Sequence, residues 1–324
     1  MRAKLFIGIV VALVCLYFAF RGISFTHLWA ALRMAEGKWI IFALCIYTVG
    51  WFFRTWRWQI LMRPILTVPV FSLWGPLILG FFANNILPFR MGELVRAHIT
   101  GQKFGISRST SLGTILLERL CDLIAFLSTF VAASLFFPFP SAAKKAAALM
   151  ALACAFLIVA LLLGIRYQKH LHQLIDRIPV SSKWKIQLQV ITEKFIQGVS
   201  GMHEIAYVAG ALGVSLIIWM IEGITLYLLV RAFPIAFSYS KAFFLLFFLG
   251  LSVTLPQAPG YVGTMELLGV TALIWLGIPK EQGMPVILAI HATQFSYIMI
   301  LGCIALWKEG LSISGLMKTT SAED

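Results

Sequence analysis

Charged residues are scarce in this sequence. They make up 12% of the 324 residues, only 13 of them are acidic, and 60% of the residues are hydrophobic. A soluble domain has about a quarter of its residues charged and about half apolar, so this chain has too little polar surface to cover a water-soluble enzyme. Intrinsic disorder needs low hydrophobicity and is excluded as well. The composition therefore predicts a helical, polytopic protein of the lipid bilayer.

The sequence also lacks the motifs of several soluble chemistries. It contains no glycine-rich loop ending in Lys-Ser/Thr, no His-Glu-x-x-His and no nucleophile elbow, so neither ATP hydrolysis nor zinc proteolysis is supported. We expect no cofactor, no metal site and no catalytic residue. Its few cysteines lie apart inside apolar stretches, where they are expected to pack as small core residues: Cys15, Cys45, Cys121, Cys154 and Cys303.

The excess of basic residues fits a membrane protein better than a nucleic-acid partner. The net charge is +13, and the lysines and arginines flank long apolar runs. About 20 apolar residues cross the hydrocarbon layer as a helix. Six segments predict full spans: 4–20, 38–62, 110–137, 143–165, 203–232 and 284–307. The first resembles a signal sequence without a cleavage site and is expected to remain as a helix.

Two further apolar regions are interrupted. The region 70–103 is broken at Asn84-Asn85-Ile86-Leu87-Pro88-Phe89-Arg90, and the region 239–277 is broken at Leu255-Pro256-Gln257-Ala258-Pro259-Gly260. The thirteen residues from 90 to 102 would reach only about 20 Å as a helix, which is too short to cross. Each region therefore predicts a re-entrant pair of half-helices around a covered or wet cavity.

The charges of the loops predict the orientation. Counting spans places residues 166–201, the most basic loop, on the cytoplasmic side together with both termini, and we expect the membrane to be a bacterial inner membrane. The two broken regions then enter from opposite faces, as in an inverted repeat with approximate halves 1–165 and 203–308 within a single domain. The linker 166–201 predicts two amphipathic helices, which either lie on the inner leaflet or cap the helix ends.

The first break holds the densest polar cluster. In one interpretation Arg90 and Arg96 bind an anionic headgroup while Glu93 orients them, and Asn84 and Asn85 shape the turn. In the other, Glu93 pairs with an arginine and only stabilises the hairpin. Ionised groups at membrane depth are costly, which makes a function the first hypothesis.

Ionisable groups also lie within two of the predicted spans. Glu118, Arg119 and Asp122 share one apolar helix and need partners, for which Arg90 or Arg96 is suited; a structural network and direct substrate contact are the two alternatives. Arg54 and Arg57 lie in an aromatic stretch. They either snorkel to the cytoplasmic interface or line the inner entrance of a lipid path.

The second break precedes another helix. Pro259, Gly260 and Gly263 allow close backbone approach, and Glu266 either binds a proton or cation or caps the half-helix. Single polar residues in the later spans are weaker candidates, because such residues more often join helices. These are Glu222, His291 and Gln294.

Three motifs in order resemble the lysylphosphatidylglycerol synthase transmembrane-region family, also called flippase-like domain proteins. They are Asn84-Asn85-x-Leu87-Pro88-x-Arg90-x-Gly92-Glu93-x-x-Arg96, Glu118-Arg119-x-x-Asp122 and Pro256-x-x-Pro259-Gly260-x-x-Gly263-x-x-Glu266, and Arg54-x-x-Arg57-Trp58 fits as well. The likeness covers about 4–308. The domain is similar to the translocating half of the multiple peptide resistance factor, whose other half is a soluble aminoacyl-transferase domain that we expect this chain to lack.

The resemblance implies a lipid translocase for an anionic or zwitterionic headgroup, carried on a phospholipid, an aminoacyl-phospholipid or a polyisoprenoid. Two alternatives remain open. One is an integral-membrane transferase of the phosphatidylglycerol lysyltransferase kind, with Glu93 or Asp122 as base. The other is a subunit that presents lipid to a separate soluble synthase. The expected partner is a membrane lipid, and in this last alternative also a separate lipid-synthesising enzyme.

Overall fold

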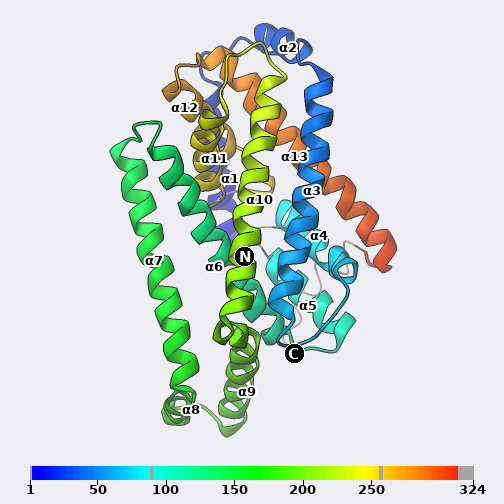
Figure 1. Cartoon of the computed structure of the whole chain (residues 1–324), viewed down its shortest axis with the longest axis vertical. Coiled ribbons are helices and arrows are strands. Elements are labelled where there is room, and N and C mark those ends of the chain that lie inside the picture. Colours follow the sequence, from blue (N-terminus) through cyan, green and yellow to red (C-terminus); the bar gives the residue numbers. More distant parts are fainter. Residues whose placement is uncertain (1, 88–90, 255–257, 313–324) are drawn as a thin grey trace.

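The computed structural model describes residues 2–87, 91–254 and 258–312, and its regular elements are helices throughout these ranges. Figure 1 shows them as a bundle elongated along one axis. The helices are α1 (Arg2–Phe20), α2 (Phe25–Arg33), α3 (Gly37–Met62), α4 (Val70–Ile86), α5 (Gly92–Phe104), α6 (Arg108–Ser134), α7 (Ser141–Arg166), α8 (Gln168–Arg177), α9 (Ser182–Val199), α10 (Ile205–Arg231), α11 (Tyr239–Thr254), α12 (Thr264–Trp275) and α13 (Lys280–Glu309), with short 3₁₀ turns η2 (Ser200–His203) and η3 (Pro259–Tyr261).

In the part of the chain that the structure describes, four helices are long and apolar enough to cross a membrane: α3, α7, α10 and α13. A fifth span is possible if α1 and α2 count as one, although the chain bends by 83° between them. Helix α6 is also 27 residues long, but Glu118, Arg119 and Asp122 lie in its middle. The protein is therefore a multi-pass helical membrane protein, and within the described ranges its apolar spans number four or five by length and composition, against the six expected.

Both interrupted regions are broken where the sequence indicated. Helix α4 ends at Ile86 and α5 begins at Gly92, while α11 ends at Thr254 and α12 begins at Thr264. In each case the two short helices pack against each other. In Figure 1 the pair α11–α12 lies towards the upper end of the bundle, and the pair α4–α5 lies below the middle. Pro88, Arg90, Pro256 and Gln257, which belong to the predicted breaks, lie outside the described residues.

The linker forms the two predicted helices at the lower end of Figure 1. Helix α9 packs on the start of α6, where the Thr110 hydroxyl donates a hydrogen bond of 3.0 Å to the Lys194 carbonyl. The apolar side chains of Leu174 and Trp184 stay exposed. This end therefore caps helix ends through α9 and also keeps apolar groups on its surface.

Two buried clusters flank the middle of the bundle. One is rich in phenylalanine and joins α6, α10, α11, α12 and α13, with Phe139 stacked on Phe244 at 4.5 Å between ring centroids. The other joins α3, α4, α5 and α13 around Trp51 and Trp58. Because stacked rings bury large apolar areas, these clusters fix the helices that surround the site.

Candidate functional site

The first hairpin is held by a tight polar turn. The Gly92 backbone N–H donates to Asn84 Oδ1 at 2.8 Å, and Asn84 Nδ2 donates to Glu93 Oε1 at a longer 3.5 Å. A Cβ at Gly92 would lie 1.9 Å from the Gly80 carbonyl oxygen, so only glycine fits between α4 and α5. Asn84, Gly92 and Glu93 thus stabilise the hairpin in this structure.

Arg96 lies inside the bundle and is bound at both ends of its fork. Its Nη1 and Nη2 donate to the two carboxylate oxygens of Glu118 at 3.1 and 2.6 Å, and its guanidinium lies 3.5 Å from the centroid of the Trp58 ring. Only 2% of Arg96 and none of Glu118 is exposed. The expected pairing of Arg96 with the acidic α6 cluster is confirmed. Arg90, the other expected partner, lies outside the described residues.

Arg57 extends the same network from α3. It is fully buried and donates to both Asp122 carboxylate oxygens and, at 2.8 Å, to Ser215 Oγ of α10; its Nη2 is also 3.2 Å from Glu118 Oε1. Of the two alternatives for Arg57, snorkelling to the interface is wrong, because the side chain is fully buried and a carboxylate partner inside the bundle satisfies its charge; the entrance of a lipid path stays a prediction. Arg54 also turns inward, and its Nη2 donates to Glu222 Oε1 of α10.

Arg119 completes the network and is its most exposed cation. It donates to Glu118 at 2.6 Å and lies 3.7 Å from Asp122, with 29% of its side chain exposed. Three arginines therefore meet two carboxylates in a buried cluster, where each charge depends on its partners. The charges of Arg57 and Arg96 are paired within this cluster, whereas Arg119 also lines the adjoining pocket.

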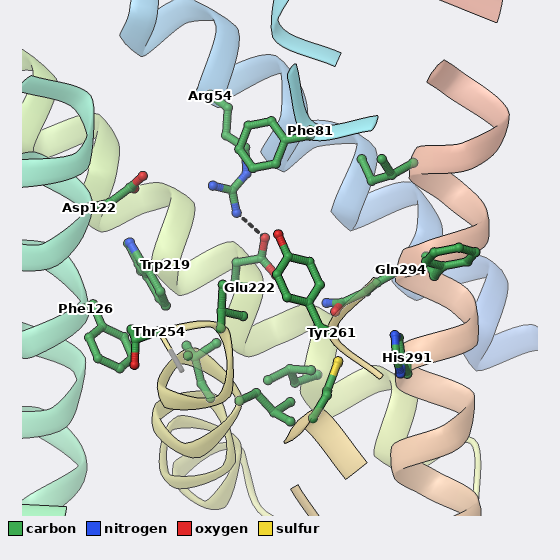
Figure 2. A pocket seen from close by; sticks show the side chains of 18 of the residues that line it. Arg54, Phe81, Asp122, Phe126, Trp219, Glu222, Thr254, Tyr261, His291 and Gln294 are labelled. Atoms are coloured by element: carbon green, nitrogen blue, oxygen red, sulfur yellow. Dashed lines mark hydrogen bonds and ion pairs between the residues drawn. The ribbon is translucent and has the colours of Figure 1, made fainter. Parts of the chain in front are cut away.

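A pocket of about 390 Å³ lies where the two hairpins meet. An added Cβ on Gly260 would be 3.7 Å from the Asn85 carbonyl oxygen, so the turn η3 touches the end of α4. Figure 2 shows the pocket with the Arg54–Glu222 pair at its centre and Tyr261 extending between Glu222 and Gln294. Charged groups line it from α3, α6 and α10, beside an aromatic wall: Arg54, Arg119, Asp122, Glu222, Tyr47, Trp51, Phe81 and Trp219.

Two of the tryptophans that line this pocket have buried indole N–H groups. Within the described residues, Trp51 Nε1 and Trp219 Nε1 are buried and have no hydrogen-bond partner. Both side chains line the pocket, Trp51 from α3 and Trp219 from α10. A buried donor without an acceptor costs free energy, so these N–H groups suit a ligand with acceptor oxygens.

The second hairpin is held by a chain of three polar contacts. Glu266 Oε2 accepts the Gly263 backbone N–H at 2.6 Å, its Oε1 lies 2.5 Å from His291 Nδ1, and His291 Nε2 lies 2.7 Å from the Gly260 carbonyl oxygen. Glu266 therefore caps the start of α12, as one interpretation of the sequence held. Pro259 is the first residue of η3.

The pocket thus gathers only part of the predicted site. Of the residues singled out, Arg54, Asn85, Arg119, Asp122 and Gly260 line it, whereas Asn84, Arg57, Glu93, Arg96, Glu118, Gly263 and Glu266 stabilise the surrounding helices. Glu222, His291 and Gln294, ranked lower from sequence, line it as well. Trp219 and Tyr261 also line the pocket and are not among the predicted site residues. The sequence indicates them only as aromatic residues near a candidate, Trp219 three residues before Glu222 and Tyr261 directly after Gly260. No group of three metal-ligating side chains occurs among the described residues.

Comparison with known proteins identifies one family over nearly the whole chain. A family model described as the lysylphosphatidylglycerol synthase TM region matches residues 5–302. A UPF0104 membrane protein of Methanothermobacter thermautotrophicus is 27% identical over 288 residues, which cover 85% of this chain and 84% of the relative. A second one from the same archaeon is 23% identical, covering 88% of this chain and 89% of the relative. One from Methanocaldococcus jannaschii is 24% identical over 69% of this chain and 92% of its own length.

Proposed function

The chain belongs to the lysylphosphatidylglycerol synthase TM region family, and on that premise we propose that it translocates a membrane lipid by binding the headgroup in its central pocket. The headgroup is anionic or zwitterionic and belongs to a phospholipid, an aminoacyl-phospholipid or a polyisoprenoid-linked lipid. The observation that supports this most is a pocket at the junction of two broken helix pairs that contains charges of both signs.

The lining matches the chemistry of such a headgroup. Arg119 and Arg54 offer guanidinium donors to phosphate oxygens, and the unpartnered Trp51 and Trp219 N–H groups add two more donors. A headgroup ammonium would meet Glu222 and the aromatic faces beside it. A phosphate would compete with Glu222 for Arg54, so binding exchanges one ion pair for another.

The size of the pocket fits a headgroup and leaves the acyl chains outside. Ligand pockets commonly measure about 300–1,000 Å³, and this one measures about 390 Å³. Helices such as α7 carry apolar side chains on their surface, where lipid tails would lie. The protein then needs to shield only the polar part of the lipid.

The two broken regions supply a path from either face. We interpret α4–α5 and α11–α12 as re-entrant pairs that enter from opposite leaflets, with α1, α3, α6, α7, α10 and α13 as the six spans around them. The basic end with α8 and α9 then lies on the cytoplasmic side of the cytoplasmic membrane. Both termini lie on that side in this arrangement.

Transport in reconstituted vesicles tests the proposal. We expect the full-length protein to move fluorescent phosphatidylglycerol and its lysyl ester between leaflets, and Arg119→Gln to slow this at least about tenfold, as expected for the loss of a charge-assisted contact of ~1.5–3 kcal/mol. Arg166→Gln, at the exposed end of α7, is the matched control. Thermal unfolding of each variant separates loss of binding from loss of folding.

Each alternative has its own result in this assay. Lipid that changes mass without changing leaflet would identify a transferase, and lipid that binds but stays in its leaflet would identify a presenting subunit. Wild-type rates for Arg119→Gln and for Trp219→Phe would remove the pocket from the proposed path.

A further inference from the structure

The contacts of His291 require a specific number of protons. The Gly260 carbonyl oxygen can only accept, so the His291 Nε2 at 2.7 Å must carry a hydrogen. The other ring nitrogen, Nδ1, lies 2.5 Å from Glu266 Oε1, and a hydrogen bond there needs one more proton. That proton resides either on the ring, as imidazolium and carboxylate, or on Glu266, as imidazole and carboxylic acid.

Loss of this shared proton breaks the arrangement. Without it, a lone pair on Nδ1 faces a carboxylate oxygen, and one of the two His291 contacts has to open. Glu266 is fixed by the Gly263 N–H and is 3% exposed, so it has little room to turn away. The contact that gives way is then the one between His291 and the turn at Gly260.

We propose that His291 and Glu266 form a proton-binding site whose occupancy holds the turn η3 against α13 and thereby couples the proposed lipid movement to a proton. The inference rests on the proposed function for its biological consequence, whereas the site itself rests on the contacts of Glu266 with Gly263 and of His291 with Glu266 and Gly260. The ligand is the proton.

The turn is suited to transmit this change to the pocket. Gly260 and Tyr261 have φ angles of +73° and +64°, values in the left-handed region that a non-glycine residue such as Tyr261 seldom adopts. Gly260 lies against Phe295 of α13 and close to Asn85 of α4, and Tyr261 extends into the pocket (Figure 2). Release of the Gly260 carbonyl therefore frees the segment that carries one pocket wall.

Other ionisable groups surround the pair from each packed side. Cys15 of α1 lies near enough to experience the charge of Glu266. Across the pocket are Arg54 of α3, Arg119 and Asp122 of α6, and Glu222 of α10, with Tyr261 on η3. Within the described residues Arg54, Arg119, Asp122 and Glu222 are in ion pairs with other groups, whereas Glu266 and His291 are paired with each other.

Nitrogen-15 NMR of histidine-labelled protein in micelles tests the site without transport. We expect the His291 ring, assigned by its loss in His291→Gln, to carry a hydrogen on Nε2 at low pH and to lose one proton in a single step as the pH is raised, after which the remaining ring hydrogen is on Nδ1, toward Glu266. In Glu266→Gln the amide donates to a neutral Nδ1, so the step disappears while the Gly260 contact remains. Equal titration in both proteins, or a ring without hydrogen on Nε2 at low pH, would overturn the inference.

A pH gradient across vesicles tests the coupling. We expect wild-type protein to accumulate fluorescent phosphatidylglycerol in one leaflet at least about threefold when the gradient is imposed. Glu266→Gln should equilibrate the lipid without accumulation, and Glu281→Gln, exposed at the start of the same α13, should behave as wild type. Equal distributions with and without the gradient would refute coupling and leave the proposed function intact. A lack of any lipid movement would refute the proposed function, and the NMR titration would still decide the proton site.

Discussion

Removing the charge of Glu118 should destabilise the protein more than removing a charge at its surface. Glu118 is fully buried, and its carboxylate forms ion pairs with Arg96, Arg57 and Arg119. In Glu118→Gln, Arg57 and Arg119 keep Asp122, but Arg96 keeps no carboxylate partner among the described residues. Breaking one partner of a buried ion pair costs about 3–5 kcal/mol, and Arg96 is only 2% exposed, so we expect a loss within that range.

Reversible unfolding in mixed detergent micelles measures this loss. The control is Glu309→Gln, whose partner Lys103 is 32% exposed in its side chain, and for which about 0–1 kcal/mol is expected. Adding Arg96→Met to Glu118→Gln should recover part of the loss, since the stranded charge is gone; pairs in contact commonly couple by about 0.5–3 kcal/mol. Equal stability of Glu118→Gln and Glu309→Gln would refute the view that this cluster is a buried, mutually dependent network.

Three further variants, one of them with a matched control, probe separate contacts. Gly92→Ala should lower the free energy of unfolding by at least ~1–3 kcal/mol, because its Cβ would lie 1.9 Å from the Gly80 carbonyl oxygen. Its control, Gly164→Ala, has nothing within 4 Å of the added Cβ and should raise that free energy by ~0.5–1 kcal/mol. Thermal unfolding measures both changes. Arg57→Lys should lose ~1–3 kcal/mol of unfolding free energy, because an ammonium cannot span both Asp122 and Ser215 as the fork does. Trp219→Phe should weaken headgroup binding about twofold to tenfold in a lipid-binding titration, and unchanged affinity would place the Nε1 donor outside the ligand's reach.

The helices and their breaks were accessible from the sequence because both have local causes. Long apolar runs gave α3, α7, α10 and α13 with ends within a few residues of those expected, and proline, glycine and asparagine marked where α4 and α11 stop. The turn between α1 and α2 was not expected. Its signals were present in Gly22, with φ +83°, and in Ser24 before the start of α2.

The partners of the charged residues were harder to predict. Arg96 and Glu118 are 22 residues apart on neighbouring helices, and their pairing followed from the cost of leaving either charge alone. Arg57 and Asp122 are 65 residues apart, and an arginine near a helix end beside tryptophans has the same pattern whether it snorkels or turns inward. Only the packing of α3 against α10 and α6 decides between these outcomes.

The pocket could not be predicted, because no single segment carries it. It combines residues from α3, α4, α6, α7, α10, α11, η3, α12 and α13, and no element contributes more than five of them. In the sequence Glu222 is a single polar residue in an apolar helix, and its partner Arg54 lies 168 residues away on α3. Sequence reasoning therefore found the residues that hold the two hairpins and ranked too low several that face the space between them.

The two sides of the pocket are held by different kinds of bond, which separates their roles. On one side, arginines of α3 and α5 bind carboxylates of α6, and because arginine stays charged at any physiological pH this side keeps its shape. On the other side, η3, α12 and α13 meet through His291, whose contacts with Glu266 and with Gly260 coexist only with a shared proton. Loss of Glu118 should thus lower stability without removing the response to pH, and Glu266→Gln should remove that response with little change in stability. A fixed wall facing a wall that depends on a proton is the asymmetry that a coupled transporter needs.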